Sequence, residues 1–157
     1  MSIRIDTSPV TGTVLAPRTE PDPFPYVFTI NGRASEPLRG WGQLTDLLSL
    51  VGMSRDSAFL IVDRIDGSER WAQAIGHADE LVVELGLPDA PMRVSRIASV
   101  PADDAELTVM TAAHTIVSAR SSELWNAADA TEIMRGWLEA ARLGLAGTNL
   151  RTPDDWR

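Results

Sequence analysis

The two histidines are the residues of this sequence with the clearest potential for acid–base or metal chemistry. His77 begins the segment His-Ala-Asp-Glu, which brings it close in sequence to Asp79 and Glu80. A histidine near carboxylates can hold a metal or act as a base. This spacing matches no zinc-binding pattern, however, and no second histidine lies close by in the sequence. The sequence therefore favours a surface turn over a functional role for His77.

His114 lies among hydroxyl side chains with which a Ser–His pair could form. These are Thr111, Ser118, Ser121 and Ser122. A nucleophilic serine has to be held on a sharp turn, and the Gly-x-Ser-x-Gly motif of such turns is absent. The sequence also has no phosphate loop and no Gly-x-Gly-x-x-Gly motif. We therefore expect a protein that is not an enzyme, with no catalytic residue, no metal site and no cofactor.

Two acidic pairs and the tryptophans are candidate contacts with a protein partner. Each acidic pair falls in a predicted turn, where adjacent carboxylates usually face water and can also meet a basic surface. A partly exposed indole near the end of a strand can anchor an interface, although burial in the core is the more common use of tryptophan. The candidate partner-binding residues are Asp79, Glu80, Asp103, Asp104, Trp71 and Trp156.

A C-terminal helix is the clearest element among those that must position these residues. Apolar residues recur through 130–141 at the spacing of one helical face, with Trp137 near its centre. Asn126 is suited to cap the start of this helix, and Gly144 is suited to stop it in a left-handed conformation. The pattern predicts a helix over residues 126–142, with its apolar face against a sheet.

The rest of the chain predicts strands and one further helix. The proline-rich composition of residues 1–25 predicts a partly extended segment. The apolar spacing over residues 41–51 predicts a helix that ends at Gly52. Predicted strands cover residues 26–30, 59–62, 70–75, 81–85, 92–100, 107–110 and 115–117. We expect one α+β domain over residues 1–157. It should have an antiparallel sheet of about five to seven strands and two main helices, the C-terminal one packed on the sheet.

Composition and charge limit the kinds of partner. The chain has 22 acidic and 14 basic residues, a formal net charge of −8, and no cysteine. This balance argues against nucleic acid as the main partner, because phosphate binding depends on excess Lys and Arg. No apolar run is long enough to cross a bilayer, and residues 1–14 do not resemble a signal peptide. We expect a cytoplasmic protein that binds neither nucleic acid nor membrane.

The last third of the chain carries a series of segments with a recognisable order. The series is Glu-Leu-Thr-Val-Met at 106–110, Ile-Val-Ser-Ala at 116–119, Glu-Leu-Trp at 123–125, Ala-Thr-Glu-Ile-Met-Arg-Gly-Trp-Leu at 130–138 and Leu-Arg-Thr-Pro-Asp-Asp-Trp at 150–156. It resembles the C-terminal half of the first immunity-protein family of bacterial polymorphic toxin systems. In that family a late strand leads into an amphipathic helix, and the chain ends in Pro-x-x-Trp after an arginine.

The resemblance implies an intracellular inhibitor, without catalysis or cofactor, that binds a cognate secreted toxin domain and blocks its active site. Such toxins often act on nucleic acid and present basic clefts, which an acidic inhibitor complements. Two alternatives remain open from the sequence: a small acidic secretion chaperone or adaptor, and a small hydrolase that uses His77 or His114. Whether the protein is a monomer or a homodimer also stays undecided.

Overall fold

The computed structural model describes residues 23–53, 58–67, 69–77, 79–87, 90–96, 106–110 and 116–152, which form two helices and ten strands. The elements are β1 Tyr26–Ile30, β2 Glu36–Pro37, α1 Trp41–Leu50, β3 Phe59–Arg64, β4 Trp71–His77, β5 Glu80–Leu87, β6 Ala90–Arg96, β7 Glu106–Met110, β8 Ile116–Arg120, the 3-10 turn η3 Ser121–Glu123, β9 Leu124–Trp125, α2 Ala127–Ala140 and β10 Thr148–Arg151.

An eight-stranded antiparallel sheet is the centre of the fold. Its strands lie in the order β10-β6-β5-β4-β3-β1-β2, and β9 pairs with the free part of β5. Strands β7 and β8 form a separate two-stranded sheet. The α+β class, the antiparallel sheet and the C-terminal helix packed on it are confirmed. The short strands β2, β9 and β10 were not predicted from the sequence.

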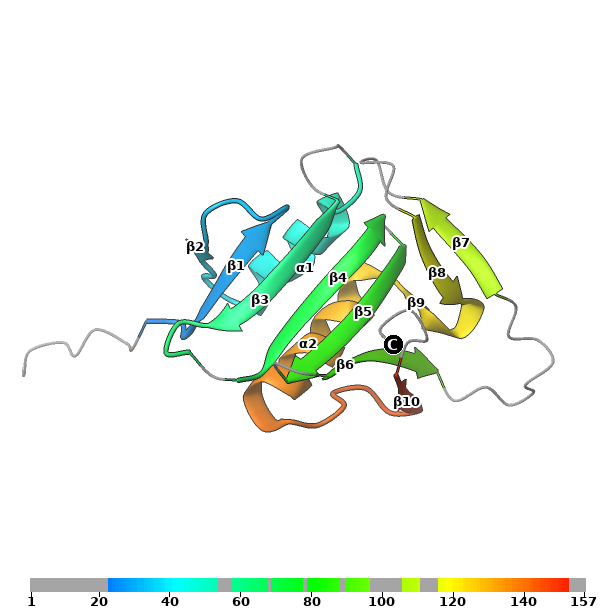
Figure 1. The fold of residues 1–157 in the computed structure, drawn as a ribbon. Helices are drawn as coiled ribbons and strands as arrows, with labels where there is room; N and C mark the ends of the chain where they lie inside the picture. Colours follow the sequence, from blue (N-terminus) through cyan, green and yellow to red (C-terminus); the bar gives the residue numbers. More distant parts are fainter. Residues whose placement is uncertain are drawn as a thin grey trace, which may run out of the picture.

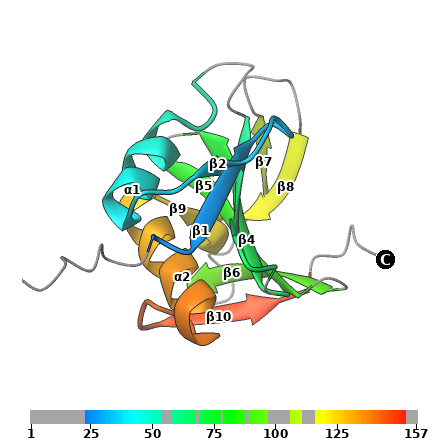
Figure 2. The ribbon, with the colours of Figure 1, turned by 90° about the vertical axis from the view of Figure 1, so that its left-hand side faces the viewer.

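Both helices cover the same face of the sheet (Figures 1 and 2). The strands turn alternate side chains toward them, so that in β4 Ala72 and Ala74 are buried and the residues between are half-buried. Apolar side chains from α1, α2 and the sheet form one core cluster, which includes Leu44, Leu48, Leu60, Val62, Leu81, Val83, Leu85, Ile133, Met134, Trp137 and Leu138. This packing places the helices on one side and leaves the other face of the sheet for different neighbours.

Helix α2 begins as predicted and ends earlier than predicted. The Asn126 side chain accepts a hydrogen bond from the Asp129 backbone N–H at 2.8 Å, which caps the helix. The helix ends at Ala140 because Ala141, with φ of 50°, takes the left-handed conformation that we expected at Gly144. The backbone N–H of Arg142 then bonds to the Gly136 carbonyl at 3.2 Å, as in a Schellman motif.

Gly144 has a different function from the predicted helix stop. Its backbone lies against α2, and a Cβ there would overlap the carbonyl oxygen of Glu132 and approach the Gly136 Cα to 3.2 Å. The close contact lets the chain turn back along α2 and enter β10, which pairs with β6 from Thr148↔Arg96 to Arg151↔Arg93. The segment after the helix thus completes one edge of the sheet.

The second face of the sheet is divided into a covered and an uncovered half. Over β5, the β7–β8 hairpin packs Val109, Val117 and Ala119 against the buried Val82. Over β1 and β3, none of the described elements packs on this face (Figure 2). The continuous apolar run at residues 59–62 is typical of a buried central strand, and β3 is a central strand that is buried on one face. In β3 only Leu60 and Val62 are buried, on the helix side.

Candidate functional site

The uncovered half of the sheet is the candidate functional site, and we call it the open face. Cross-strand pairing arranges its side chains in rows: Val27, Asp63 and Trp71 form one row, and Thr29, Ile61 and Gln73 form the next. All of them are half-buried. The open face consists of Val27, Thr29, Phe59, Ile61, Asp63, Trp71 and Gln73. Neither core cluster includes the four apolar residues of the open face, which are Val27, Phe59, Ile61 and Trp71. Their side chains therefore add apolar surface to this face without filling the interior.

Trp71 is held in place by a glycine on the neighbouring strand. Trp71 pairs with Gly86 of β5, and a Cβ at Gly86 would overlap the six-membered ring of the indole. The absence of a side chain at Gly86 lets the indole lie directly against the β5 backbone. The tryptophan is therefore fixed on the sheet and half-buried, and a rigid indole of this kind is suited to anchor an interface.

Asp63 is a carboxylate on an apolar part of the open face. Val27 and Trp71 are its neighbours on the adjacent strands. No hydrogen bond or ion pair joins Asp63 to another residue of the described part of the chain. Burial raises the pKa of the Asp63 carboxyl above its ordinary value of 3.8, because its charged form loses water without gaining a partner.

We predict that the Asp63→Asn variant is more stable than the wild type at neutral pH. A carboxyl whose pKa is raised by folding contributes most stability below its unfolded pKa, and this contribution is lost as pH rises through the folded pKa. The difference in free energy of unfolding between variant and wild type should therefore grow as the pH rises from 3.8. Urea unfolding over this range measures it, and a difference that does not change with pH would contradict the raised pKa.

A buried network of charged side chains lies on the covered half of the same face of the sheet. Glu84 of β5 and Arg93 of β6 are both buried, and Arg93 Nη2 donates to Glu84 Oε1 at 3.1 Å. Arg93 Nη1 lies 3.6 Å from Oε2 of Glu123, whose side chain has no exposed area. Arg151 of β10 completes the set through a two-point pair with Glu123, in which its Nη2 donates at 3.0 Å. Two acids and two arginines thus balance each other inside the fold.

This network is continuous with the open face. Gln73 Nε2 donates a hydrogen bond to Glu84 Oε2 at 3.2 Å. This bond connects the row of Thr29, Ile61 and Gln73 on the open face to the network. On the hairpin side, Arg93 Nη1 donates to the Ser118 carbonyl at 2.5 Å. The network therefore joins β5, β6, β8, η3 and β10.

The structure separates the predicted site residues. Trp71 lies on the open face, whereas Asp79 and Glu80 are exposed at the other end of β4, about 20 Å away at roughly 3.3 Å per residue. His77, predicted in a turn, is the last residue of β4, and its Nε2 lies 3.2 Å from Glu80 Oε2. Asp103, Asp104, His114 and Trp156 lie outside the described residues.

Sequence reasoning missed Asp63, Phe59 and Ile61 as members of the site. The signal was present in the apolar run at residues 59–62, which we interpreted as a buried central strand. A strand can also be apolar on both faces because one face meets the core and the other is left for a partner. The polar residue that ends the run, Asp63, marks the second possibility.

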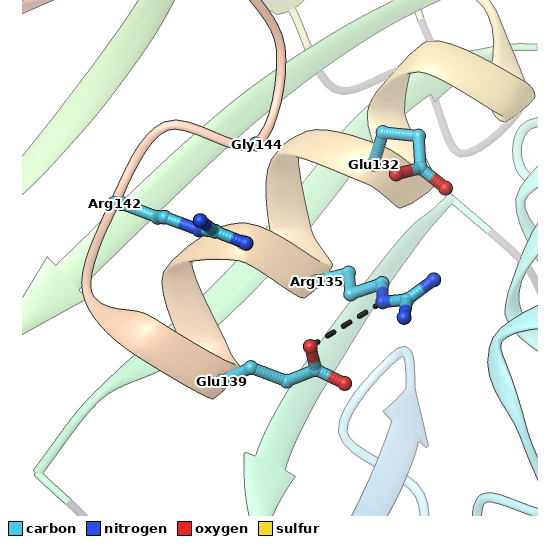
Figure 3. A pocket seen from close by; sticks show the side chains of 6 residues that line it. Glu132, Arg135, Glu139, Arg142 and Gly144 are labelled. Atoms are coloured by element: carbon cyan, nitrogen blue, oxygen red, sulfur yellow. Dashed lines mark hydrogen bonds and ion pairs between the residues drawn. The ribbon is translucent and has the colours of Figure 1, made fainter.

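A hollow lies between α2 and the segment that follows it. It has a volume of about 250 Å³ and is lined by Glu132, Arg135, Gly136, Glu139, Arg142 and Gly144 (Figure 3). Glu139 accepts hydrogen bonds from the Trp41 indole at 3.0 Å and from Arg135 Nε at 3.4 Å. Trp41 is half-buried and packs against the main core cluster. Two carboxylates and two guanidinium groups line the hollow, so its charges are balanced.

Two features of the described residues bear on other functions. No group of three or more His, Asp or Glu side chains in the described ranges is arranged to hold a metal ion. None of the helices in this part of the chain is long and apolar enough to span a membrane.

Comparison of the chain with protein-family models, with curated proteins and with solved structures finds no match in any of the three.

Proposed function

We propose that this protein is an immunity protein that binds a cognate toxin domain through the open face and neutralises it by covering the toxin's active site. The observation that carries the proposal is the open face itself. It combines apolar side chains, a fixed and half-buried Trp71, and a carboxylate at Asp63 that has no partner among the described residues. Contiguous apolar area of this kind on a soluble domain is typical of a protein-binding surface.

The sequence supports the proposed partner in two ways. The last third of the chain resembles an immunity-protein family, and the net charge of −8 suits a partner with a basic cleft. A toxin domain that acts on nucleic acid has such a cleft, because it must attract phosphates. In this proposal the inhibitor acts in the cytoplasm of the cell that makes it. The exposed Asp79 and Glu80 then contribute attraction at the edge of the contact.

Co-expression tests the proposal. The chain is expressed together with the toxin domain encoded beside its gene, and growth and complex formation are measured. We expect the chain to restore growth and to form a stable one-to-one complex. Failure to restore growth with any neighbouring toxin would contradict the proposal. A homodimer that buries Trp71 without any toxin would favour the adaptor alternative.

Trp71→Ala is the variant that tests the open face. Truncation of an interface tryptophan typically costs at least about 2 kcal/mol of binding, which weakens the affinity roughly 30-fold. Calorimetric titration of the purified toxin domain measures the effect. Trp41→Ala is the matched control, because it removes the same side chain from α1, on the opposite side of the sheet. The affinity of this variant for the toxin domain should equal that of the wild type at a temperature where both variants are folded. Equal losses for both variants would contradict the assignment of the open face.

A further inference from the structure

The row Val27–Asp63–Trp71 contains a charge without a counter-charge. Asp63 is half-buried between an aliphatic and an aromatic neighbour, and it has no hydrogen-bond or ion-pair partner in the described ranges. The next residue, Arg64, does not compensate it. Arg64 lies on the helix side, where it pairs with Asp66 at 2.7 Å and its Cζ is 5.9 Å from the centre of the Tyr26 ring.

A partly desolvated carboxylate without a partner is energetically unfavourable in the isolated protein, and a cation placed beside it removes that cost. The second neighbour, Trp71, favours cations as well, because the face of an indole attracts a positive charge. The protein already uses this pairing elsewhere in the sheet, where Arg96 Cζ lies 4.1 Å from the centre of the Trp125 ring. Carboxylate and indole together therefore select a cation with a flat apolar surface.

We propose that Asp63 and Trp71 form the receptor for an arginine side chain of the bound protein. This inference rests on the proposed function and specifies the chemistry of the partner. A guanidinium can stack on an indole and bond a carboxylate through its fork of N–H donors, whereas the lysine ammonium is a compact and strongly hydrated charge. Toxin domains that bind nucleic acid carry arginines for phosphate recognition, so the site takes a residue that the toxin needs for its own substrate.

The polar residues of the adjacent row suit this arrangement. Thr29 and Gln73 flank Ile61 on the neighbouring register, two residues along each strand from Val27 and Trp71. Gln73 is held by Glu84 at 3.2 Å, and the Thr29 hydroxyl lies 2.9 Å from that of Ser35. Both side chains have a hydrogen-bond partner within the protein. Asp63 is the carboxylate of this surface, and a partner's donor can engage it without breaking a described contact.

An NMR titration with small probes tests the inference without any toxin. The probe is N-acetyl-arginine amide, and N-acetyl-citrulline amide is the control that has nearly the same shape without the charge. The observed signals are the Trp71 indole N–H resonance, assigned with Trp71→Phe, and the Asp63 carboxyl carbon. We expect the arginine compound to shift the indole signal saturably at tens of millimolar and to lower the pKa of the Asp63 carboxyl. The citrulline compound should do neither.

Two variants complete the titration at constant ionic strength. Asp63→Asn should abolish the saturable shift of the indole signal. Asp46→Asn removes the same charge from an exposed position of α1 and should leave the shift unchanged. The inference is overturned if citrulline acts like arginine, or if the response survives in Asp63→Asn. A negative titration together with a Trp71-dependent toxin complex would refute the arginine site and leave the proposed function standing.

Discussion

Replacing Glu123 with alanine is expected to lower the free energy of unfolding by about 3–5 kcal/mol, because Arg93 would keep its charge inside the fold with half of its compensation removed. Glu123 is fully buried and lies between Arg93 and Arg151, which face the same side of neighbouring strands. Its carboxylate also accepts the Arg120 backbone N–H at 3.2 Å. Urea unfolding measures the loss, and near-ultraviolet circular dichroism reports whether the native packing remains.

The same substitution at an exposed glutamate is the matched control for Glu123. Glu132→Ala removes a carboxylate from the exposed side of α2 and should change the free energy of unfolding by less than about 0.5 kcal/mol. Arg151→Ala should give an intermediate loss, because Arg151 is partly exposed and Arg93 still balances Glu123. If Glu123→Ala were as mild as Glu132→Ala, the network would not hold the sheet together.

Trp137→Ala is expected to destabilise the protein by about 3–5 kcal/mol, since it leaves a large cavity between α2 and the sheet. Trp137 belongs to the main core cluster and is 8% exposed. Its effect on partner binding should be indirect, through the fraction of molecules that are folded. Thermal unfolding together with toxin titration below the transition separates the two effects. A folded Trp137→Ala variant that no longer binds would place α2 in the interface.

Trp137→Phe refines the same prediction. The indole Nε1 of Trp137 is buried and has no hydrogen-bond partner among the described residues. Phenylalanine keeps most of the ring and removes a donor that bonds to none of those residues, so the loss should be clearly smaller than for alanine. A loss as large as that of Trp137→Ala would show that the indole N–H has an important partner.

Local patterns in the sequence predict much of the fold because they report local physics. The apolar spacing of residues 130–141 and the cap at Asn126 predict α2, and the strand predicted at residues 70–75 corresponds to β4. The turns at Asn31-Gly32 and Asp66-Gly67 have the positive φ values that their composition suggests, at Asn31, Gly32 and Gly67. In each case the information lies within a few residues of the element it determines.

The features that the sequence does not reveal depend on distant parts of the chain. The network joins Glu84, Arg93, Glu123 and Arg151, and no local pattern indicates that four charged residues on separate elements will be buried together. The strands β9 and β10 form because β5 and β6 offer edges to them, and β9 has only two residues. The open face has the same origin, because the β7–β8 hairpin packs over β5 and no described element packs over the same face of β3.

The candidate site was found only in part for the same reason. Trp71 was identified as a partner-binding residue from its position near a strand end, and it does lie on the open face. Asp63 was missed because its significance comes from Val27 and Trp71 on two other strands, and from the absence of a described partner. A charged residue in a turn is easily noticed in a sequence. A charged residue within a sheet can be recognised as unpaired only when the strand register, and therefore its neighbours, are known.

The most direct test of the open face is methyl cross-saturation from an unlabelled toxin domain to the isoleucine methyl groups of this protein. Ile61 lies on the open face, and Ile75 lies at its margin. Ile65 is exposed in the β3–β4 turn, whereas Ile133 is a residue of α2 that is buried in the main core cluster. We predict strong attenuation at Ile61, a weaker one at Ile75, and none at Ile133. A toxin complex that leaves Ile61 unaffected and attenuates methyl groups of the helix layer would contradict the assignment of the open face as the binding surface.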